Sequence, residues 1–228
     1  MIILAFDSSV NACSVSIWQD GKDVFSETKE MFTGQAEALL PMVADVLDKA
    51  KIKPQEINAV AVTSGPGSFT GIRIGLSAAN ALGFALNVPV IGVSTMEALV
   101  YSLPEMLDNQ PLGVVIDTKR NDFYFQLFDN KRQAVSEIFY YKAEEICGFL
   151  EKMNLTEVNL VGDGVGRFLA EANSNKRITF NEFYKTNYPL SIKIASIASN
   201  ELTKITPKRQ TAIVKPLYLR PPDVSMPK

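Results

Sequence analysis

The chain has 228 residues, of which 46% are hydrophobic and 21% charged, a composition typical of a globular protein with one large domain or two small ones. Its formal net charge of −2 argues against a protein that binds nucleic acid alone through phosphate neutralisation. The sequence contains no histidine, which excludes Ser-His-Asp and Cys-His catalysis, histidine zinc sites and imidazole proton shuttles within this chain.

Hydrophobic patterning in the first half predicts strands and helices in a clear order. Alternating and fully apolar runs indicate strands, and apolar residues on one face indicate helices. Asp20-Gly21 is typical of a hairpin turn. In chain order we expect strands over residues 2–6, 13–19 and 23–28, a helix over 35–50, a strand over 59–63, a helix over 70–86 and a strand over 89–93.

The second half repeats this order. A strand ends at Asp117, as the first strand ends at Asp7, and turns at Asp20 and Asp129 follow the second strand of each half. Further elements are expected over residues 123–128, 143–152, 158–161 and 166–172. We therefore predict an α/β protein with two similar lobes and a cleft between them, over residues 1–104 and 105–210. Residues 211–228 would form an extension that is partly disordered.

The stretch "TSGPGSFTGIRIG", residues 63–75, has the glycine content of a phosphate-binding loop but fits neither standard motif. A P-loop requires Gly-Lys, which is absent, and a dinucleotide fingerprint requires glycine where Thr70 stands. Backbone N–H groups at a helix N-terminus can still hold an anion. The pattern favours close packing over phosphate binding.

Gly71, Gly75, Ala79 and Gly83 are spaced by four and form one ridge on the predicted second helix. A helical glycine is about 0.5–1 kcal/mol less favourable than alanine, so this ridge needs a compensating contact. That contact is either packing inside the chain or a helix-helix contact with another subunit. The sequence leaves both open.

Asp7 and Asp117 occupy the positions of metal-phosphate carboxylates in two-lobed ATPase folds. Turn-capping aspartates are a common alternative. Asp7 is followed by Ser8 and Ser9, and the turn after Asp117 also lacks glycine. We therefore expect at most a degraded nucleotide site at Asp7, Ser8, Ser9 and Asp117. A small-molecule kinase or ATPase using Mg-ATP is the alternative function.

Cellular location is indicated by three features. The first residues have no basic region before Asp7, no apolar run approaches membrane-span length, and Cys13 and Cys147 do not make a disulfide framework. We expect both cysteines to be small buried hydrophobes in a cytoplasmic protein with no membrane contact.

The glycine loop, the opening "ILAFDSSVNACSVSIW" and the tail motif "PLYLRPPDV" closely resemble the TsaB (YeaZ) family, subunits of the bacterial machinery that makes threonylcarbamoyladenosine in tRNA. The resemblance implies the actin/Hsp70/sugar-kinase fold with two RNase H-like lobes. It also implies a non-catalytic subunit without a cofactor. Many family members have a histidine where Gln35 stands here, and without histidine ligands the old metallopeptidase label finds no support.

The resemblance also implies partners. The N-terminal lobe would bind the catalytic subunit TsaD, the ATPase TsaE would join the pair, and tRNA would be contacted at most indirectly. The same surface would form a homodimer when TsaD is missing. The candidate partner surface consists of Leu39, Leu40, Val43, Leu47, Gly71, Gly75, Ala79 and Gly83.

Overall fold

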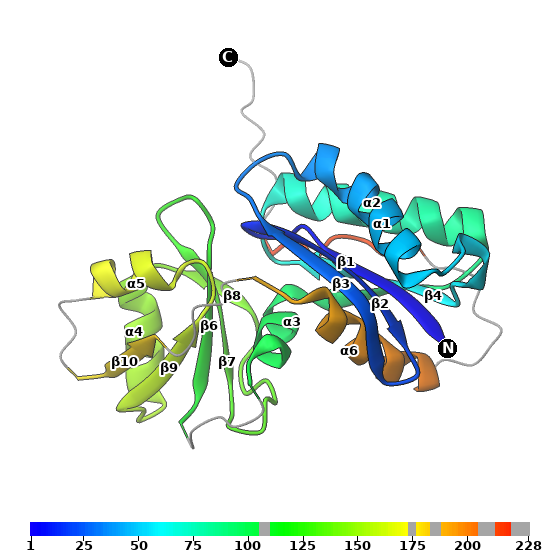
Figure 1. The fold of residues 1–228 in the computed structure, drawn as a ribbon. Helices are drawn as coiled ribbons and strands as arrows, with labels where there is room; N and C mark the ends of the chain where they lie inside the picture. The colour runs from blue at the N-terminus through cyan, green and yellow to red at the C-terminus, as the bar shows by residue number, and fades with distance from the viewer. Residues whose placement is uncertain (105–109, 173–176, 183–187, 205–212, 220–228) are drawn as a thin grey trace, which may run out of the picture.

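The structure is a computed structural model that describes residues 1–104, 110–172, 177–182, 188–204 and 213–219. The described residues form two lobes, each built on a five-stranded mixed sheet with helices packed against it (Figure 1). The N- and C-terminal halves of the chain supply one sheet each, as the sequence repeat predicts.

The first lobe follows the predicted order closely. Asp20 and Gly21 both have positive φ angles, 48° and 90°, which is the backbone that a tight two-residue hairpin requires. Its elements are β1 (Ile2–Asp7), β2 (Ala12–Gln19), β3 (Lys22–Glu30), α1 (Gln35–Ala50), a short 3₁₀ helix (Pro54–Glu56), β4 (Ala59–Gly65), α2 (Phe69–Leu86), β5 (Val90–Ser94) and α3 (Thr95–Ser102).

The second lobe has the same topology. The strand order is β3-β2-β1-β4-β5 in the first sheet and, read in the same direction, β8-β7-β6-β9-β10 in the second. This match confirms the two-lobed α/β repeat. The elements of the second half are β6 (Leu112–Asp117), β7 (Phe123–Phe128), β8 (Phe139–Tyr141), α4 (Ala143–Lys152), β9 (Glu157–Val161), α5 (Val165–Ala172), β10 (Thr179–Glu182) and α6 (Ser191–Lys204).

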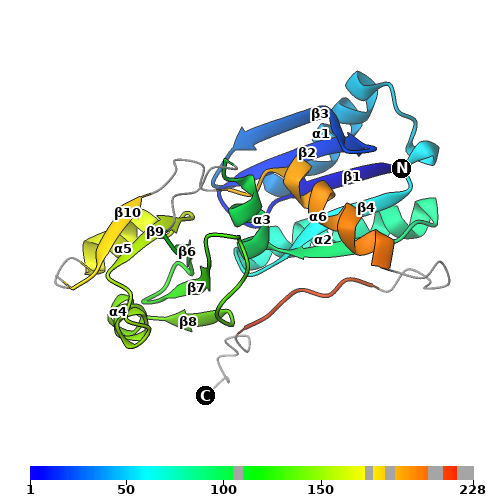
Figure 2. The same ribbon diagram turned by 90° about the horizontal axis from the view of Figure 1, so that it is seen from below.

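Helix α6 crosses from the second half of the chain to the first lobe, which corrects the predicted boundary of 105–210 for the second lobe, and α3 packs between the two lobes. Helix α6 packs beneath the first sheet, where Ile194 and Ala198 share a buried cluster with Ile3 (Figure 2). Helix α3 turns its apolar side to the second sheet, with Leu99 clustered against Val114. Each sheet thereby gains cover for its second face, and α3 and α6 tie the lobes together.

The C-terminal extension is also part of the first lobe. Residues 213–219 lie along α2, and the backbone of Val214 is hydrogen-bonded to the side chain of Asn80. The predicted disorder concerns residues 220–228, which lie outside the described residues, as do residues 105–109 at the predicted lobe boundary.

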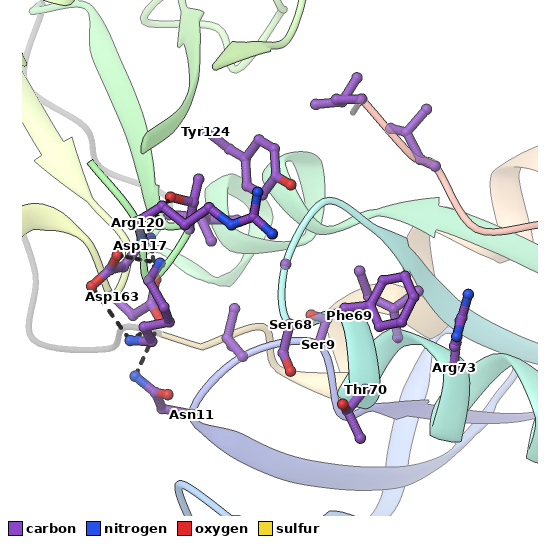
Figure 3. Close-up of a pocket in the computed structure, with 18 of the residues that line it drawn as sticks. Ser9, Asn11, Ser68, Phe69, Thr70, Arg73, Asp117, Arg120, Tyr124 and Asp163 are labelled. Carbon is purple, nitrogen blue, oxygen red and sulfur yellow. Dashed lines mark hydrogen bonds and ion pairs between the residues drawn. The ribbon is translucent and has the colours of Figure 1, made fainter. Parts of the chain in front are cut away.

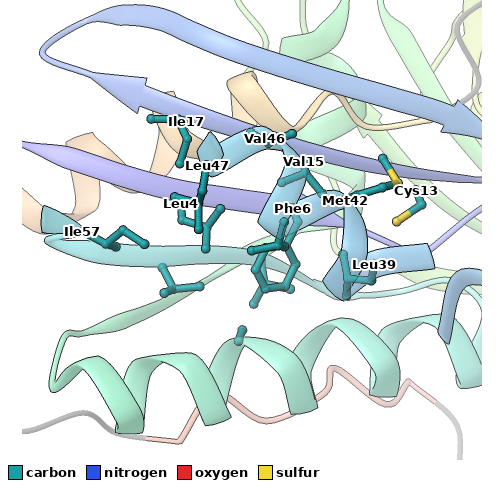
Figure 4. Close-up of a cluster of buried hydrophobic side chains, with 14 of the residues drawn as sticks. Leu4, Phe6, Cys13, Val15, Ile17, Leu39, Met42, Val46, Leu47 and Ile57 are labelled. Carbon is teal, nitrogen blue, oxygen red and sulfur yellow. The ribbon is translucent and has the colours of Figure 1, made fainter. Parts of the chain in front are cut away.

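The apolar face of α1 packs against its own sheet and is not a free surface. Leu39, Val43 and Leu47 are buried in one cluster with Phe6 and Leu4 (Figure 4). The prediction that these three leucine and valine side chains contact a partner is therefore wrong, because the sheet already covers the face that the periodicity reveals. Leu40, on the opposite side of α1, is 54% exposed.

The small-residue ridge of α2 also faces inward. Gly71, Gly75, Ala79 and Gly83 are all buried. A Cβ on Gly71 would lie 2.0 Å from the Ser8 carbonyl oxygen, and one on Gly83 would lie 2.2 Å from Val90 Cγ2. The ridge thus packs inside the chain, and the prediction of a subunit contact through it is wrong. The ridge is buried because α2 lies close to the β1–β2 turn and to β5.

Helix α2 qualifies the expectation that no apolar run reaches membrane-span length. Among the described helices it alone is long and apolar enough, by length and composition, to cross a membrane. Its inner side carries the buried small-residue ridge and belongs to the core of the first lobe. Core helices of soluble proteins commonly pass this length and composition test.

Candidate functional site

A cleft of about 620 Å³ lies between the two lobes (Figure 3). The first lobe contributes the turn after β1, the loop and first turns of α2, and part of the segment 213–219. The second lobe contributes the turn after β6, Tyr124 of β7 and Asp163. The charged side chains that line the cleft are Arg73, Asp117, Lys119, Arg120 and Asp163.

The glycine loop forms one wall of the cleft and is held by protein contacts. A Cβ on Gly67 would lie 2.3 Å from the carbonyl oxygen of Ser9, and Ser68 N donates a hydrogen bond to the same oxygen at 2.7 Å. The Ser68 hydroxyl accepts from Gly71 N at 3.2 Å and caps α2. Two backbone amides at the start of this helix are therefore used within the chain, which supports packing as the reason for the glycines.

Asp7 is sealed beneath this wall and does not line the cleft. Its Oδ1 accepts from the hydroxyls of Ser9 and Thr63, both at 2.5 Å, and from Ser9 N at 3.1 Å. Its Oδ2 is buried, and no hydrogen-bond partner for it lies in the part of the chain that the structure describes. Burial raises the pKa of Asp7 to about 6, although these hydrogen bonds lower it in part. Ser8 donates to the Gly71 carbonyl at 2.8 Å and is likewise committed to packing.

Asp117 lies at the end of β6 on the opposite wall and is paired with cations. Arg167 Nη1 donates to Asp117 Oδ1 at 2.5 Å, and Lys119 Nζ lies 3.5 Å from Oδ2. The guanidinium of Arg167 also stacks over the ring of Phe123, 4.0 Å from its centroid. The carboxylate is therefore an anchor for α5 within the second lobe.

Asp163 connects the lobes from the turn between β9 and α5. One of its oxygens accepts from Asp117 N at 3.0 Å, and the other accepts from Asn11 Nδ2 of the first lobe at 3.1 Å. Burial raises the pKa of Asp163 above its ordinary value. This residue holds the turn after β1 against the second lobe at the edge of the cleft (Figure 3).

Sequence comparison places the chain among known proteins. A family model described as "TsaD: tRNA N6-adenosine threonylcarbamoyltransferase" matches residues 33–220, which is more than half of the chain. The chain belongs to this family. Within the TsaD family, it is 26% identical to "tRNA threonylcarbamoyladenosine biosynthesis protein TsaB" of Haemophilus influenzae, covering 96% of this chain and 94% of that protein. This full-length match confirms the resemblance to TsaB.

Solved structures confirm the expected fold of this TsaD-family chain. YeaZ from Pseudomonas aeruginosa superposes with a TM-score of 0.77 at 23% identity, covering 96% of this chain and 99% of that chain. A ROK hexokinase from Thermus thermophilus superposes with a TM-score of 0.50 at 10% identity, covering 90% and 100%. Both likenesses concern the fold alone, and the second places it with the sugar-kinase type.

The geometry of the TsaD-family cleft disfavours the kinase alternative. Asp7 is closed off beneath the cleft wall, whereas Asp117 faces the cleft and is held by Arg167, so the two carboxylates do not share one open space. Of the four predicted nucleotide-site residues, only Ser9 and Asp117 line the cleft. Among the described residues, no group of three or more Cys, Asp or Glu side chains is placed to hold a metal ion.

Several residues of the cleft were not predicted from the sequence. Asp163 and its partner Asn11 are 152 positions apart, and Arg73 meets Tyr218 across 145 positions. Because the partners are so far apart in the sequence, no local pattern predicts these pairs, although the Gly-Asp-Gly turn that contains Asp163 is visible in the sequence. The burial predicted for Cys13 and Cys147 is confirmed, and burial raises the pKa of the Cys13 thiol to about 12.

Proposed function

We propose that this chain is a non-catalytic subunit of the bacterial tRNA threonylcarbamoyladenosine machinery, which binds TsaD and supports its transfer reaction. The observation that carries the proposal is the similarity to a TsaB protein over nearly the whole of both chains. The ATPase TsaE would join the pair, tRNA would be contacted at most indirectly, and the assembly would work in the cytoplasm without a cofactor on this chain.

The chemistry of the chain supports an accessory role. It contains no histidine, so it offers no imidazole to a metal or to a proton transfer. The carboxylates at the ends of β1 and β6 are engaged by hydroxyls and by Arg167 respectively. Both carboxylates thereby position the turns that follow their own strands, which favours a structural role for them.

The partner surface is better placed on the outer sides of α1 and α2 than on the faces named from the sequence. These helices lie side by side over the first sheet (Figure 1). Leu40 on α1 is 54% exposed, Phe84 on α2 is 84% exposed, and Phe32 before α1 is 84% exposed. Exposed aromatic and aliphatic side chains are typical anchors of protein interfaces. We assign this face to TsaD and, when TsaD is missing, to a second copy.

Reconstitution tests the proposed function directly. The purified chain alone should show neither threonylcarbamoyl transfer nor peptidase activity, whereas its addition to the cognate TsaD, TsaE and a threonylcarbamoyl donor should restore tRNA modification. Asp117→Asn should leave the restored rate near the wild-type value, because the carboxylate has a structural role. Transfer by this chain without TsaD, persisting after repurification, would overturn the proposal.

A surface substitution tests the assigned face. Leu40→Asp should weaken TsaD binding at least tenfold, which corresponds to about 1.4 kcal/mol, because it places a charge in an apolar interface. Its melting temperature should stay near that of the wild-type chain, since Leu40 is exposed. The measurements are a pull-down and a thermal melt. Val135→Asp, at a position of the second lobe that is 46% exposed, is the matched control and should bind TsaD normally. Normal binding by Leu40→Asp would remove this face from the interface.

A further inference from the structure

The segment 213–219 packs against the first lobe in a groove that we define by Asn80 of α2, Ser64 of β4 and Gly92 of β5. It runs along α2 and past the ends of β4 and β5 to the cleft (Figure 2). Residues 205–212, which precede it, lie outside the described residues. Val214 and Pro216 are half-buried while Lys215 is exposed, the alternation of an extended peptide on a surface.

The groove holds the backbone of this segment. Asn80 of α2 donates from Nδ2 to the Val214 carbonyl at 3.0 Å and accepts from Val214 N at Oδ1 at 3.1 Å. The amide of Leu217 donates to the Ser64 carbonyl at 2.8 Å. A side-chain amide that satisfies both polar groups of one residue is how extended peptides are commonly recognised, because it reads the main chain in a single register.

Two glycines make room for the segment. A Cβ on Gly92 of β5 would lie 2.5 Å from Val214 Cγ1, and a Cβ on Gly65 would lie 3.2 Å from the Leu217 carbonyl oxygen. Val214 also packs against the buried cluster beneath α1 and α2. The groove therefore has a side-chain seat for Val214, and any larger residue at position 92 would fill it.

The far end of the segment builds part of the cleft. Tyr218 stacks on Phe69 with ring centroids 5.7 Å apart and accepts a hydrogen bond from Arg73 Nε at 2.7 Å. The guanidinium of Arg73 lies 3.6 Å from the centroid of Phe69. Leu217, Tyr218 and Leu219 are all among the residues that line the cleft. The position of this segment thus determines the shape of the cleft mouth.

We propose that the groove between Asn80 of α2 and the ends of β4 and β5 is a peptide-binding site for an extended apolar segment, occupied here by residues 213–219 of the same chain. Its occupation completes the wall of the cleft and orders Arg73 and Phe69 there. Asn80 and Ser64 recognise the ligand through hydrogen bonds to its backbone. One small apolar side chain of the ligand packs over Gly92. This inference is independent of the partner assigned above.

The test uses a substitution to displace the segment in the full-length chain and then adds the same segment as a separate peptide. Val214→Asp places a carboxylate in the apolar seat, so the amides of residues 213–219 should exchange with solvent at least tenfold faster by mass spectrometry. A fluorescein-labelled peptide of sequence IVKPLYL should then bind this variant, measured by anisotropy, at least tenfold more tightly than the wild-type chain. In the wild-type chain the tethered segment competes at a high effective concentration.

Matched variants make the result decisive. The peptide IDKPLYL and the double variant Val214→Asp, Gly92→Val should each lose binding at least tenfold, with the fold of each chain checked by circular dichroism. Asn80→Ala, in which the seat for Val214 is intact, should still speed amide exchange of the segment. Unchanged exchange in Val214→Asp and Asn80→Ala would overturn the proposal. So would equal peptide binding by the wild-type and Val214→Asp chains, or no binding by a folded Val214→Asp chain.

Discussion

A chain carrying Gly71→Ala should be less stable than the wild-type chain by about 3 kcal/mol, although alanine is the better helix former by about 0.5–1 kcal/mol. The added Cβ would lie 2.0 Å from the carbonyl oxygen of Ser8 and 3.1 Å from its carbonyl carbon. Both are backbone atoms of a buried turn. The Ser8 hydroxyl, moreover, is bonded to the Gly71 carbonyl at 2.8 Å, so the turn cannot retreat without losing this contact. The steric term should therefore exceed the gain in helix propensity.

Urea denaturation followed by circular dichroism measures this loss as a lower midpoint with an unchanged slope. Ser77→Ala is the matched control, because Ser77 lies on the exposed side of the same helix and its replacement should change stability by no more than about 0.5 kcal/mol. If Gly71→Ala is as stable as the control, α2 can move away from the β1–β2 turn, and the close approach is not what the glycine serves.

This ridge shows what the sequence reveals and what it leaves open. Spacing by four places Gly71, Gly75 and Gly83 on one side of a helix, because that follows from helical geometry alone. Whether that side meets the chain's own sheet or another protein depends on contacts with Ser8, Val62 and Val90. Those contacts exist only once the sheet has formed, so the local pattern was compatible with both alternatives.

The repeat of the two lobes was predictable for a different reason. In each sheet the first three strands pair as consecutive hairpins, and the remaining strands follow in chain order on the other side of the first strand. Hydrophobic runs and hairpin turns therefore indicate the topology. Helix α6 was not predicted, and its docking could not have been. Its β-branched residues weaken the helical signal, and its buried side packs on β1 across about 190 positions. The site residues Asp163 and Asn11 escaped for the same long-range reason.

The second large effect concerns the pH dependence of stability. Burial raises the pKa of Asp7 to about 6 from its usual 3.8, so the folded chain holds this proton at pH values where the unfolded chain has released it. The stabilisation by the protonated form is thus fully present below about pH 4 and is lost as the pH rises through 6. Two pKa units correspond to about 3 kcal/mol at pH 7.

Asp7→Asn should abolish this dependence because an amide does not ionise. Its Oδ1 can still accept from Ser9 and Thr63, while the new amide group occupies the place of the unpartnered oxygen at a fixed cost. The free energy of unfolding of Asp7→Asn, minus that of the wild-type chain, should therefore rise by about 2.5 kcal/mol between pH 4 and pH 7. Urea denaturation at half-unit steps of pH measures this difference. Thr63→Val removes a hydrogen bond that lowers the pKa of Asp7, so it should extend the loss of stability to higher pH. A difference between Asp7→Asn and the wild-type chain that is constant with pH would show that Asp7 is ionised in the folded protein throughout this range, and that the sealed turn stabilises its charge.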